Sequence, residues 1–223
     1  MLTKPKLLIF DVNETLLNMQ PLKSKVNFAL KNDFAFAIWF STLLHYSLVE
    51  SVSQRYRSFS AIAAATFEMV SQQFNVSLTP ADIQNILSTI TKLPAHPDVA
   101  EGLTNLKLAQ YKIAALTNGD LKVAEAQLNY AGIRPYFDMV LSVESVGYYK
   151  PHPNAYAHAL KTMNCAGNDA MMIAAHGWDI MGAQQAGIQS CFIARPSQFQ
   201  YPLVAEADLT CSDLIEVARV LAA

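Results

Sequence analysis

Short, continuous runs of apolar residues occur near the start of the chain and again in its second half. Runs without polar alternation are typical of strands that are covered on both faces of a sheet. Four such runs predict strands, at 7–10, 113–116, 171–174 and 191–194. A weaker fifth run lies at 139–141. Amphipathic segments of helical length lie between most of them, at 98–108, 121–131 and 154–163. This alternation of strands and helices predicts an α/β fold with a parallel sheet.

The segment 18–94 breaks this rhythm, because no part of it resembles a strand. Its pattern predicts four helices, at about 21–31, 34–57, 59–74 and 80–90. Thr79 is well placed to cap the last of these, since Pro80 follows in the first turn and Asp82 lies three residues on. Asp98 is similarly a candidate cap for the helix that follows the segment. We therefore expect a helical insertion between the first strand and the rest of the sheet.

Composition narrows the possible functions. Apolar residues make up 52% of the chain and charged residues 15%, which provides ample material for a core and excludes a disordered chain. A net charge of −2 gives no electrostatic basis for binding nucleic acid or an anionic membrane. No apolar run approaches the roughly 20 residues that span a bilayer. Three cysteines without metal-ligand spacing, and the absence of a recognisable signal peptide, predict a cytoplasmic protein with reduced thiols.

Polar residues follow four of the predicted strands. Asp11, Asn13, Glu14 and Thr15 follow the first, and the segments 117–120, 150 and 175–179 follow others. Because ligands bind outside the carboxyl ends of parallel strands, we expect these residues to meet at one edge of the sheet. Each has a purely structural interpretation by itself, such as an N-cap, a turn or a solvated lysine. Their joint occurrence at successive strand ends favours a catalytic site.

The residue types suit nucleophilic catalysis by a carboxylate. Asp11 can attack an electrophilic centre and form a covalent ester. Lys150 can hold Asp11 ionised through its charge. Hydroxyl and amide groups can donate hydrogen bonds to the nucleophile or to a substrate carboxylate, from Thr15, Thr117 and Asn118. Asp179 or His176 can activate the water that hydrolyses the ester, with Asp179 orienting the His176 ring.

The same residues, in the same order, resemble the four motifs of the haloacid dehalogenase superfamily. The motifs are Asp11-Val12-Asn13-Glu14-Thr15-Leu16, Leu116-Thr117-Asn118-Gly119, Lys150-Pro151 and His176-Gly177-Trp178-Asp179. The resemblance covers nearly the whole chain. It implies a Rossmann-like parallel-sheet core, here residues 1–17 and 95–223, with an inserted helical cap at 18–94.

Within the superfamily, the chain is most similar to the type II L-2-haloacid dehalogenases. Their nucleophile is followed four residues on by threonine, as by Thr15, and their lysine six residues on by tyrosine, as Lys150 is by Tyr156. Their last motif has a tryptophan and an aspartate, matching Trp178 and Asp179. Leu44 and Phe59 match apolar pocket positions. The resemblance implies a metal-independent hydrolase without a cofactor, whose substrate is a small organic acid that carries a displaceable group, a halide by analogy.

The chemistry of the residues and the resemblance together give the expected site residues. The catalytic set is Asp11, Thr15, Lys150, Asp179 and His176, and the substrate-binding set is Thr117, Asn118, Asn13, Phe40, Tyr156 and Trp178. Asn13 and Ala175 stand where phosphatases of the superfamily usually carry aspartates, which argues against magnesium-dependent phosphate transfer. Phe40 aligns with an arginine that receives the halide in the dehalogenases. His176 aligns with an asparagine. Arg55 and Arg57 are alternative cations of the cap, although as exposed helix residues they suit solvation better.

Two other interpretations stay open. The chain can be a phosphatase or phosphonate-type hydrolase of the same superfamily, or a catalytically degenerate member kept for binding or regulation. Phe40 favours the last, whereas the intact Asp11, Lys150 and Asp179 oppose it. The apolar helices of the cap make a homodimer a further expectation. The partner expected in every enzymatic case is a small-molecule substrate.

Overall fold

The computed structural model describes residues 4–222, and its centre is a parallel sheet of six strands in the order β3-β2-β1-β4-β5-β6. The strands are β1 (Leu7–Phe10), β2 (Lys112–Thr117), β3 (Met139–Ser142), β4 (Ala170–Ala174), β5 (Gln189–Ile193) and β6 (Leu209–Cys211). Every neighbouring pair runs parallel. The order reverses at β1, which lies between β2 and β4. The carboxyl end of β1 is therefore the point where a ligand is expected to bind.

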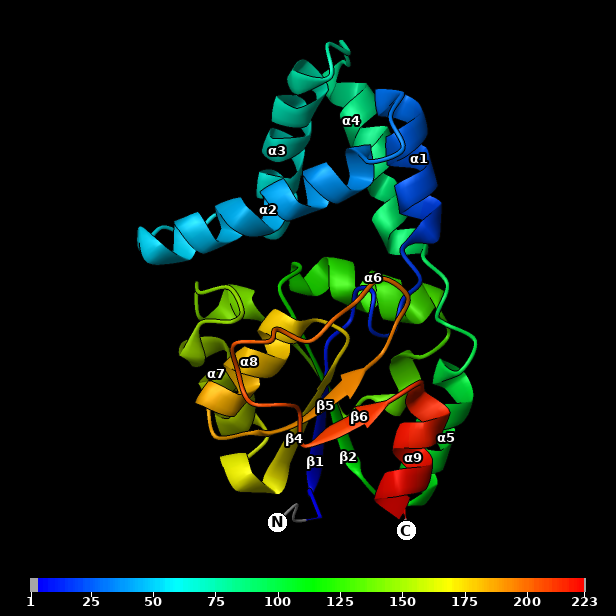
Figure 1. Cartoon of the computed structure of the whole chain (residues 1–223), viewed down its shortest axis with the longest axis vertical. Coiled ribbons are helices and arrows are strands. Elements are labelled where there is room, and N and C mark those ends of the chain that lie inside the picture. The colour runs from blue at the N-terminus through cyan, green and yellow to red at the C-terminus, as the bar shows by residue number, and fades with distance from the viewer. Residues whose placement is uncertain (1–3, 223) are drawn as a thin grey trace.

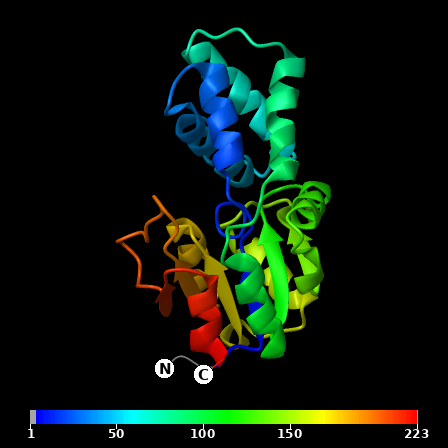
Figure 2. The same ribbon diagram turned by 90° about the vertical axis from the view of Figure 1, so that its right-hand side faces the viewer.

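Helices cover both faces of the sheet, as Figures 1 and 2 show. Leu8 and Phe10 of β1 pack in one cluster with α5 (Val99–Leu108) and α9 (Leu214–Ala222). Leu7 and Ile9 point to the other face, toward α7 (Pro153–Thr162) and α8 (Gly177–Gln185). The helix α6 (Leu121–Tyr130) follows β2. This layered arrangement confirms the predicted α/β class.

Four helices and a 3₁₀ turn lie beyond the carboxyl edge of the sheet (Figure 1). They are α1 (Gln20–Leu30), α2 (Ala35–Val52), α3 (Phe59–Gln73), α4 (Pro80–Leu87) and the 3₁₀ turn η1 (Ser88–Lys92). The start of α4 is confirmed: Thr79 Oγ1 accepts from the Asp82 amide at 3.2 Å, and the Asp82 carboxylate accepts from the Thr79 amide at 2.9 Å. The helix predicted at 34–57 ends earlier, at Val52, because Gln54 takes a left-handed φ of 55°.

Two chain segments connect these helices to the sheet, and they run side by side. Leu17 forms an isolated antiparallel bridge with Ala95, and the Asn18 amide donates to the Pro94 carbonyl at 2.8 Å. The boundaries of the predicted helical insertion, 18 and 94, were inferred from the sequence pattern and lie in these two connecting segments. The division of the chain into two folding units stays a prediction.

Three features differ from the sequence-based expectations. β6 and α9 were not predicted, since Leu209–Cys211 is a short edge strand whose central residue, Thr210, is exposed. Asp98 precedes α5, but its side chain makes no cap bond and instead pairs with Arg195, as described below.

All three cysteines are free thiols. No helix within residues 4–222 combines the length and the apolar character needed to cross a membrane.

Candidate active site

Asp11 follows β1 directly and is 5% exposed, so the central strand places its carboxylate at the carboxyl edge of the sheet. A tight turn returns the chain, and Thr15 Oγ1 donates to Asp11 Oδ2 at 2.7 Å. The same oxygen lies 3.0 Å from His176 Nδ1, while Oδ1 accepts from Lys150 Nζ at 2.9 Å. Burial alone would raise the pKa of Asp11, but the charge of Lys150 and the bond to His176 outweigh it and hold the pKa well below its usual range. Asp11 is therefore ionised.

Lys150 is buried and its ammonium has three acceptors: Asp11 Oδ1, Asp179 Oδ2 at 2.6 Å and the Leu116 carbonyl at 2.9 Å. Burial opposes its charge, but the two carboxylates outweigh burial and raise the pKa of Lys150. Tyr156 donates to Asp179 Oδ1 at 2.6 Å. Burial raises the pKa of the Asp179 carboxyl, although Lys150 opposes this. The result is a fully buried cation that links the carboxylates after β1 and β4.

His176 lies between two carboxylates. Its Nδ1 faces Asp11 Oδ2, its Nε2 lies 2.9 Å from Glu14 Oε2, and its ring stacks on Trp178 with centroids 5.0 Å apart. Burial would lower the pKa of His176, but the hydrogen bonds to Asp11 and Glu14 outweigh it and raise the pKa to about 10. In the ligand-free protein near neutral pH, the ring is thus an imidazolium that donates both N–H groups.

This arrangement corrects one expectation about His176. Asp179 was expected to orient the ring, but its side chain is bonded to Lys150 and Tyr156 instead. Glu14 fills that place. A doubly protonated ring has no lone pair to accept a proton, so the predicted role of His176 as a base requires that the ring first lose a proton.

The remaining predicted residues divide into two groups. Several are bonded to the protein itself: Thr117 Oγ1 accepts from the Gly119 amide at 3.0 Å, Asn118 Oδ1 from the Lys150 amide at 2.8 Å, and Asn13 Oδ1 from Gln127 Nε2 at 2.8 Å. Phe40 and Trp178 line open space instead.

Two cavities flank Phe40. One is a cleft of about 630 Å³, lined by Glu14, His176 and Trp178 from the core and by Phe40 and Leu44 from α2. The other has about 230 Å³ and is mainly apolar; it is lined in part by Trp39, Phe40, Leu43, Phe59 and Asn13. The helical segment thus supplies an apolar wall opposite the polar strand ends. Cations line only the larger cleft, and they are Lys23, Arg195 and the His176 imidazolium.

Sequence reasoning missed Glu14 and Arg195 as parts of this site. Arg195 follows β5 and its guanidinium binds Asp98 through two bonds of 2.7 and 2.9 Å, while Nε donates to the Thr15 carbonyl at 3.1 Å. The same strand-end rule that identified Asp11 would have found Arg195. The alternative cations of the cap do not reach the site: neither Arg55 nor Arg57 lines either cavity, and Arg57 pairs with Glu50 on the surface.

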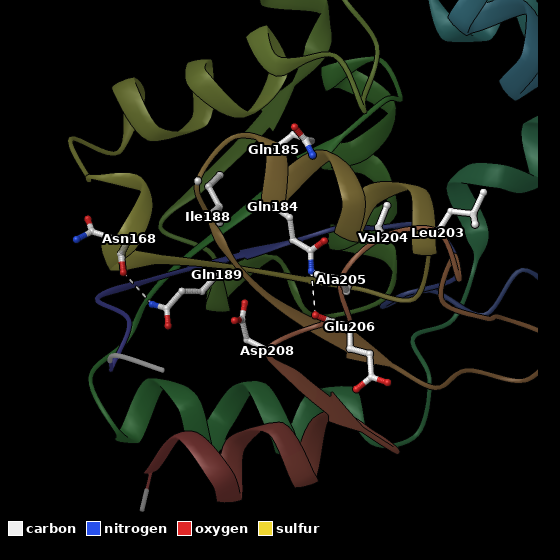
Figure 3. Close-up of a pocket in the computed structure, with 11 residues that line it drawn as sticks. Asn168, Gln184, Gln185, Ile188, Gln189, Leu203, Val204, Ala205, Glu206 and Asp208 are labelled. Atoms are coloured by element: carbon white, nitrogen blue, oxygen red, sulfur yellow. Dashed lines mark hydrogen bonds between the residues drawn. The ribbon is translucent and has the colours of Figure 1, made fainter. Parts of the chain in front are cut away.

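A further cavity of about 740 Å³ is lined by residues at the start of β5 and by the segment that precedes β6, and Asp11 is not among them; Figure 3 shows these lining residues. Two of its polar side chains are bonded within the protein: Gln184 Nε2 donates to the Ala205 and Glu206 carbonyls at 3.1 Å, and Asp208 accepts from the Ser190 amide and hydroxyl, while no lysine, arginine or histidine of the described residues lines the cavity. It therefore lacks the grouping of charges seen at Asp11.

The groups around Asp11 do not form a set of ligands that suits Mg²⁺. Position 13 is an amide bonded to Gln127, position 175 is an alanine, and three donors already occupy the Asp11 carboxylate. Magnesium prefers several oxygen ligands in octahedral geometry. In the described part of the chain, no group of three or more histidine, cysteine or acidic residues is arranged to hold a metal ion.

The comparison with known families decides the class of this protein. A model of the haloacid dehalogenase-like hydrolases matches residues 5–187. The chain belongs to this family. This haloacid dehalogenase-like hydrolase is 25% identical over 195 residues to the (S)-2-haloacid dehalogenase of Xanthobacter autotrophicus. The aligned region covers 86% of this chain and 76% of that enzyme. It is 26% identical over 159 residues to the (S)-2-haloacid dehalogenase of Pseudomonas sp. strain YL, covering 71% and 68%.

The solved structures agree with the fold of a haloacid dehalogenase-like hydrolase. The L-2-haloacid dehalogenase of Xanthobacter autotrophicus with chloropropionic acid covalently bound superposes with a TM-score of 0.91, at 21% identity, over 97% of this chain and 98% of that one. The predicted Rossmann-like core is thereby confirmed.

Proposed function

We propose that this hydrolase displaces halide from a small 2-haloacid through a covalent ester on Asp11. The observation that carries the proposal is the Asp11 carboxylate, which is buried yet kept ionised by Lys150, with Thr15 and His176 fixing its other oxygen. A desolvated, oriented carboxylate is an effective nucleophile. The names of the relatives reported above give the substrate class.

The reaction has two steps. An Asp11 oxygen attacks the α-carbon, the carbon–halogen bond breaks and the halide leaves with the electron pair. Among the described residues Oδ1 accepts only from Lys150 whereas Oδ2 accepts twice, so we assign the attack to Oδ1. Water then adds to Asp11 Cγ, and the ester bond breaks to release the 2-hydroxyacid.

The other groups have supporting roles in this proposal. Lys150 balances the charge of Asp11 and Asp179, and Tyr156 holds Asp179. Trp178 and Phe40 contact the apolar part of the substrate. Thr117, Asn118 and Asn13 stay predicted substrate contacts. A homodimer and a cytoplasmic location likewise stay predictions.

A single turnover in H₂¹⁸O tests the proposal. With the enzyme in excess over 2-bromopropionate, we expect an unlabelled hydroxyl in the product, because its oxygen comes from Asp11, and ¹⁸O in the peptide that contains Asp11. Label in the first-turnover product would mean direct attack by water and would overturn the proposal.

Parallel assays with EDTA and with added Mg²⁺, using phosphate esters beside 2-haloacids, separate this function from phosphatase activity. We expect halide release that EDTA leaves unchanged. Turnover of phosphate esters that EDTA abolishes would assign the phosphatase function instead, whereas a protein inert toward both substrate classes would be a binding member of the family.

A further inference from the structure

Glu14 and Asp11 present two carboxylates to the same imidazole ring. Asp11 Oδ2 lies 3.0 Å from Nδ1 and Glu14 Oε2 lies 2.9 Å from Nε2. Glu14 has a left-handed φ of 60°, which is uncommon for a residue other than glycine, asparagine or aspartate. Its carbonyl oxygen is held by His96 Nε2 at 3.0 Å. A costly backbone conformation that is fixed by its surroundings often marks a functional site, and here it directs the Glu14 side chain to His176.

The two carboxylates differ in what happens to them during the reaction. In the proposed mechanism Asp11 becomes an ester and loses its negative charge, whereas Glu14 keeps its charge. Esterification therefore removes one of the two anions that hold the ring protonated. The proton that becomes labile is the one on Nδ1, since Nε2–H still donates to Glu14.

We propose that the Glu14–His176 pair is the proton carrier of ester hydrolysis, and that esterification of Asp11 converts His176 from an acid into a base. His176 is the catalytic residue, because its Nδ1 faces the Asp11 carboxyl that water attacks. Glu14 is a positioning residue, which selects the nitrogen that loses its proton. This inference rests on the proposed function.

The protons balance over the cycle. When Asp11 forms the ester and halide leaves, the Nδ1 proton of His176 passes to solvent through the cleft. Neutral Nδ1 then takes a proton from the water that adds to Cγ. The imidazolium returns this proton to the departing alkoxide, and the new Asp11 carboxyl gives its own proton to Nδ1. The products are the hydroxyacid, the Asp11 carboxylate and the His176 imidazolium, which is the starting state.

Among the described residues, only Asp11 and Glu14 raise the pKa of His176, and the cations near the ring are either paired with other carboxylates or largely neutral. Lys150 lies on the far oxygen of Asp11 and stays paired with Asp179. Arg195 lines the same cleft but is paired with Asp98. For His96, burial and the nearby Arg195 lower the pKa, so it adds little positive charge near neutral pH.

The inference can be tested without any substrate, because Asp11→Asn removes the same charge as esterification with little change in shape. The ring nitrogens of ¹⁵N-labelled histidine are followed by NMR as a function of pH, and His176→Asn identifies the His176 signals among the five histidines. In the wild type we expect both His176 nitrogens to stay protonated through neutral pH. In Asp11→Asn we expect the pKa to fall by about 1–3, with Nδ1 losing the proton.

Two variants of Glu14 isolate its part. Glu14→Gln keeps an acceptor for Nε2–H but not the charge, so the neutral ring should retain its proton on Nε2. Glu14→Met keeps neither, and the neutral ring should then populate both tautomers. An unchanged His176 titration in Asp11→Asn, loss of the proton from Nε2 there, or identical tautomers in Glu14→Gln and Glu14→Met would overturn the inference.

A kinetic measurement separates this inference from the proposed function. At about pH 9, which lies below the folded pKa of about 10 but at or above the lowered value, rapid mixing with 2-bromopropionate should release up to one proton together with the halide. His176→Ala should accumulate an ester on Asp11 that intact-mass spectrometry detects. If the ester forms but His176→Ala hydrolyses it at the wild-type rate, the inference fails, the proposed function stands and Asp179 becomes the candidate base. If ¹⁸O shows direct attack by water, the proposed function fails and the inference fails with it.

Discussion

The side chain of Asn118 binds both ends of the Lys150 backbone unit. Its Oδ1 accepts from the Lys150 amide at 2.8 Å and its Nδ2 donates to the Lys150 carbonyl at 3.4 Å. The loop after β2 therefore fixes the residue that follows β3, and through it the position of the ammonium beside Asp11. Asn118 thus contributes to the site by positioning Lys150, whether or not it also touches the substrate.

Asn118→Ala should lower both stability and turnover. The substitution leaves the Lys150 amide without its acceptor, which costs about 1–3 kcal/mol of unfolding free energy. Turnover should fall because the ammonium is no longer held in place. Urea denaturation and initial rates of halide release measure the two effects. Asn129→Ala, whose side chain bonds the Glu125 carbonyl on the exposed side of α6, is the matched control and should change neither by a comparable amount.

Lys150→Met should move the acid limb of the reaction to higher pH. Without the lysine, the burial that raises the pKa of Asp11 is opposed by His176 and Thr15 but no longer by the ammonium. The pH at which ester formation declines should rise by about 1–3. The variant should also lose about 3–5 kcal/mol of stability, because two buried carboxylates lose their shared partner. Lys6→Met, which removes an exposed ion pair with Asp169, should leave the pH profile unchanged.

Because His176 is charged in the folded protein, the free energy of unfolding should fall as the pH becomes alkaline. The folded pKa of about 10 lies above the ordinary value of 6.5, so the stabilisation is fully present below about pH 6.5 and is lost as the pH rises through about 10. Urea denaturation between these limits should show a decline of a few kcal/mol in unfolding free energy, on the order set by 1.36 kcal/mol per pKa unit. In His176→Asn this slope should be absent; an equal slope there would place its origin in another group.

Phe40→Arg should accelerate halide release. Phe40 lies between the two cavities and stacks on Phe36 with ring centroids 5.5 Å apart, so an arginine there would reach open space next to the site. One charge-assisted hydrogen bond to the leaving halide is worth about 1.5–3 kcal/mol, or roughly 10- to 150-fold in rate. The rate constant of the bromide burst measures it. Phe40→Leu serves as the uncharged control. The cationic role would be contradicted if both variants released halide faster than the wild type, or if Phe40→Arg showed no gain.

The sequence predicted strands β1 to β5 and the polar residues at the ends of four of them, because a buried parallel strand requires a local apolar run and the polar residue that ends it is adjacent. It did not predict which side chains pair. Glu14 and His176, or Asp98 and Arg195, are far apart in the chain, and only the packing of the sheet brings each pair together. Residue type alone also did not predict the protonation state of His176, since this state depends on two carboxylates that contact the ring, Asp11 directly after β1 and Glu14 from the turn that follows.

The bridge between Leu17 and Ala95 places the entry and exit of the helical segment next to each other. A segment whose two ends are adjacent can be replaced by another of different length and sequence without stretching β1 or displacing α5. The wall of the cleft that the helical segment provides can therefore change while β1 and its carboxyl end keep their geometry. Grafting the helical segment of a relative between positions 17 and 95 would exchange the apolar wall while Asp11 and Lys150 keep their places.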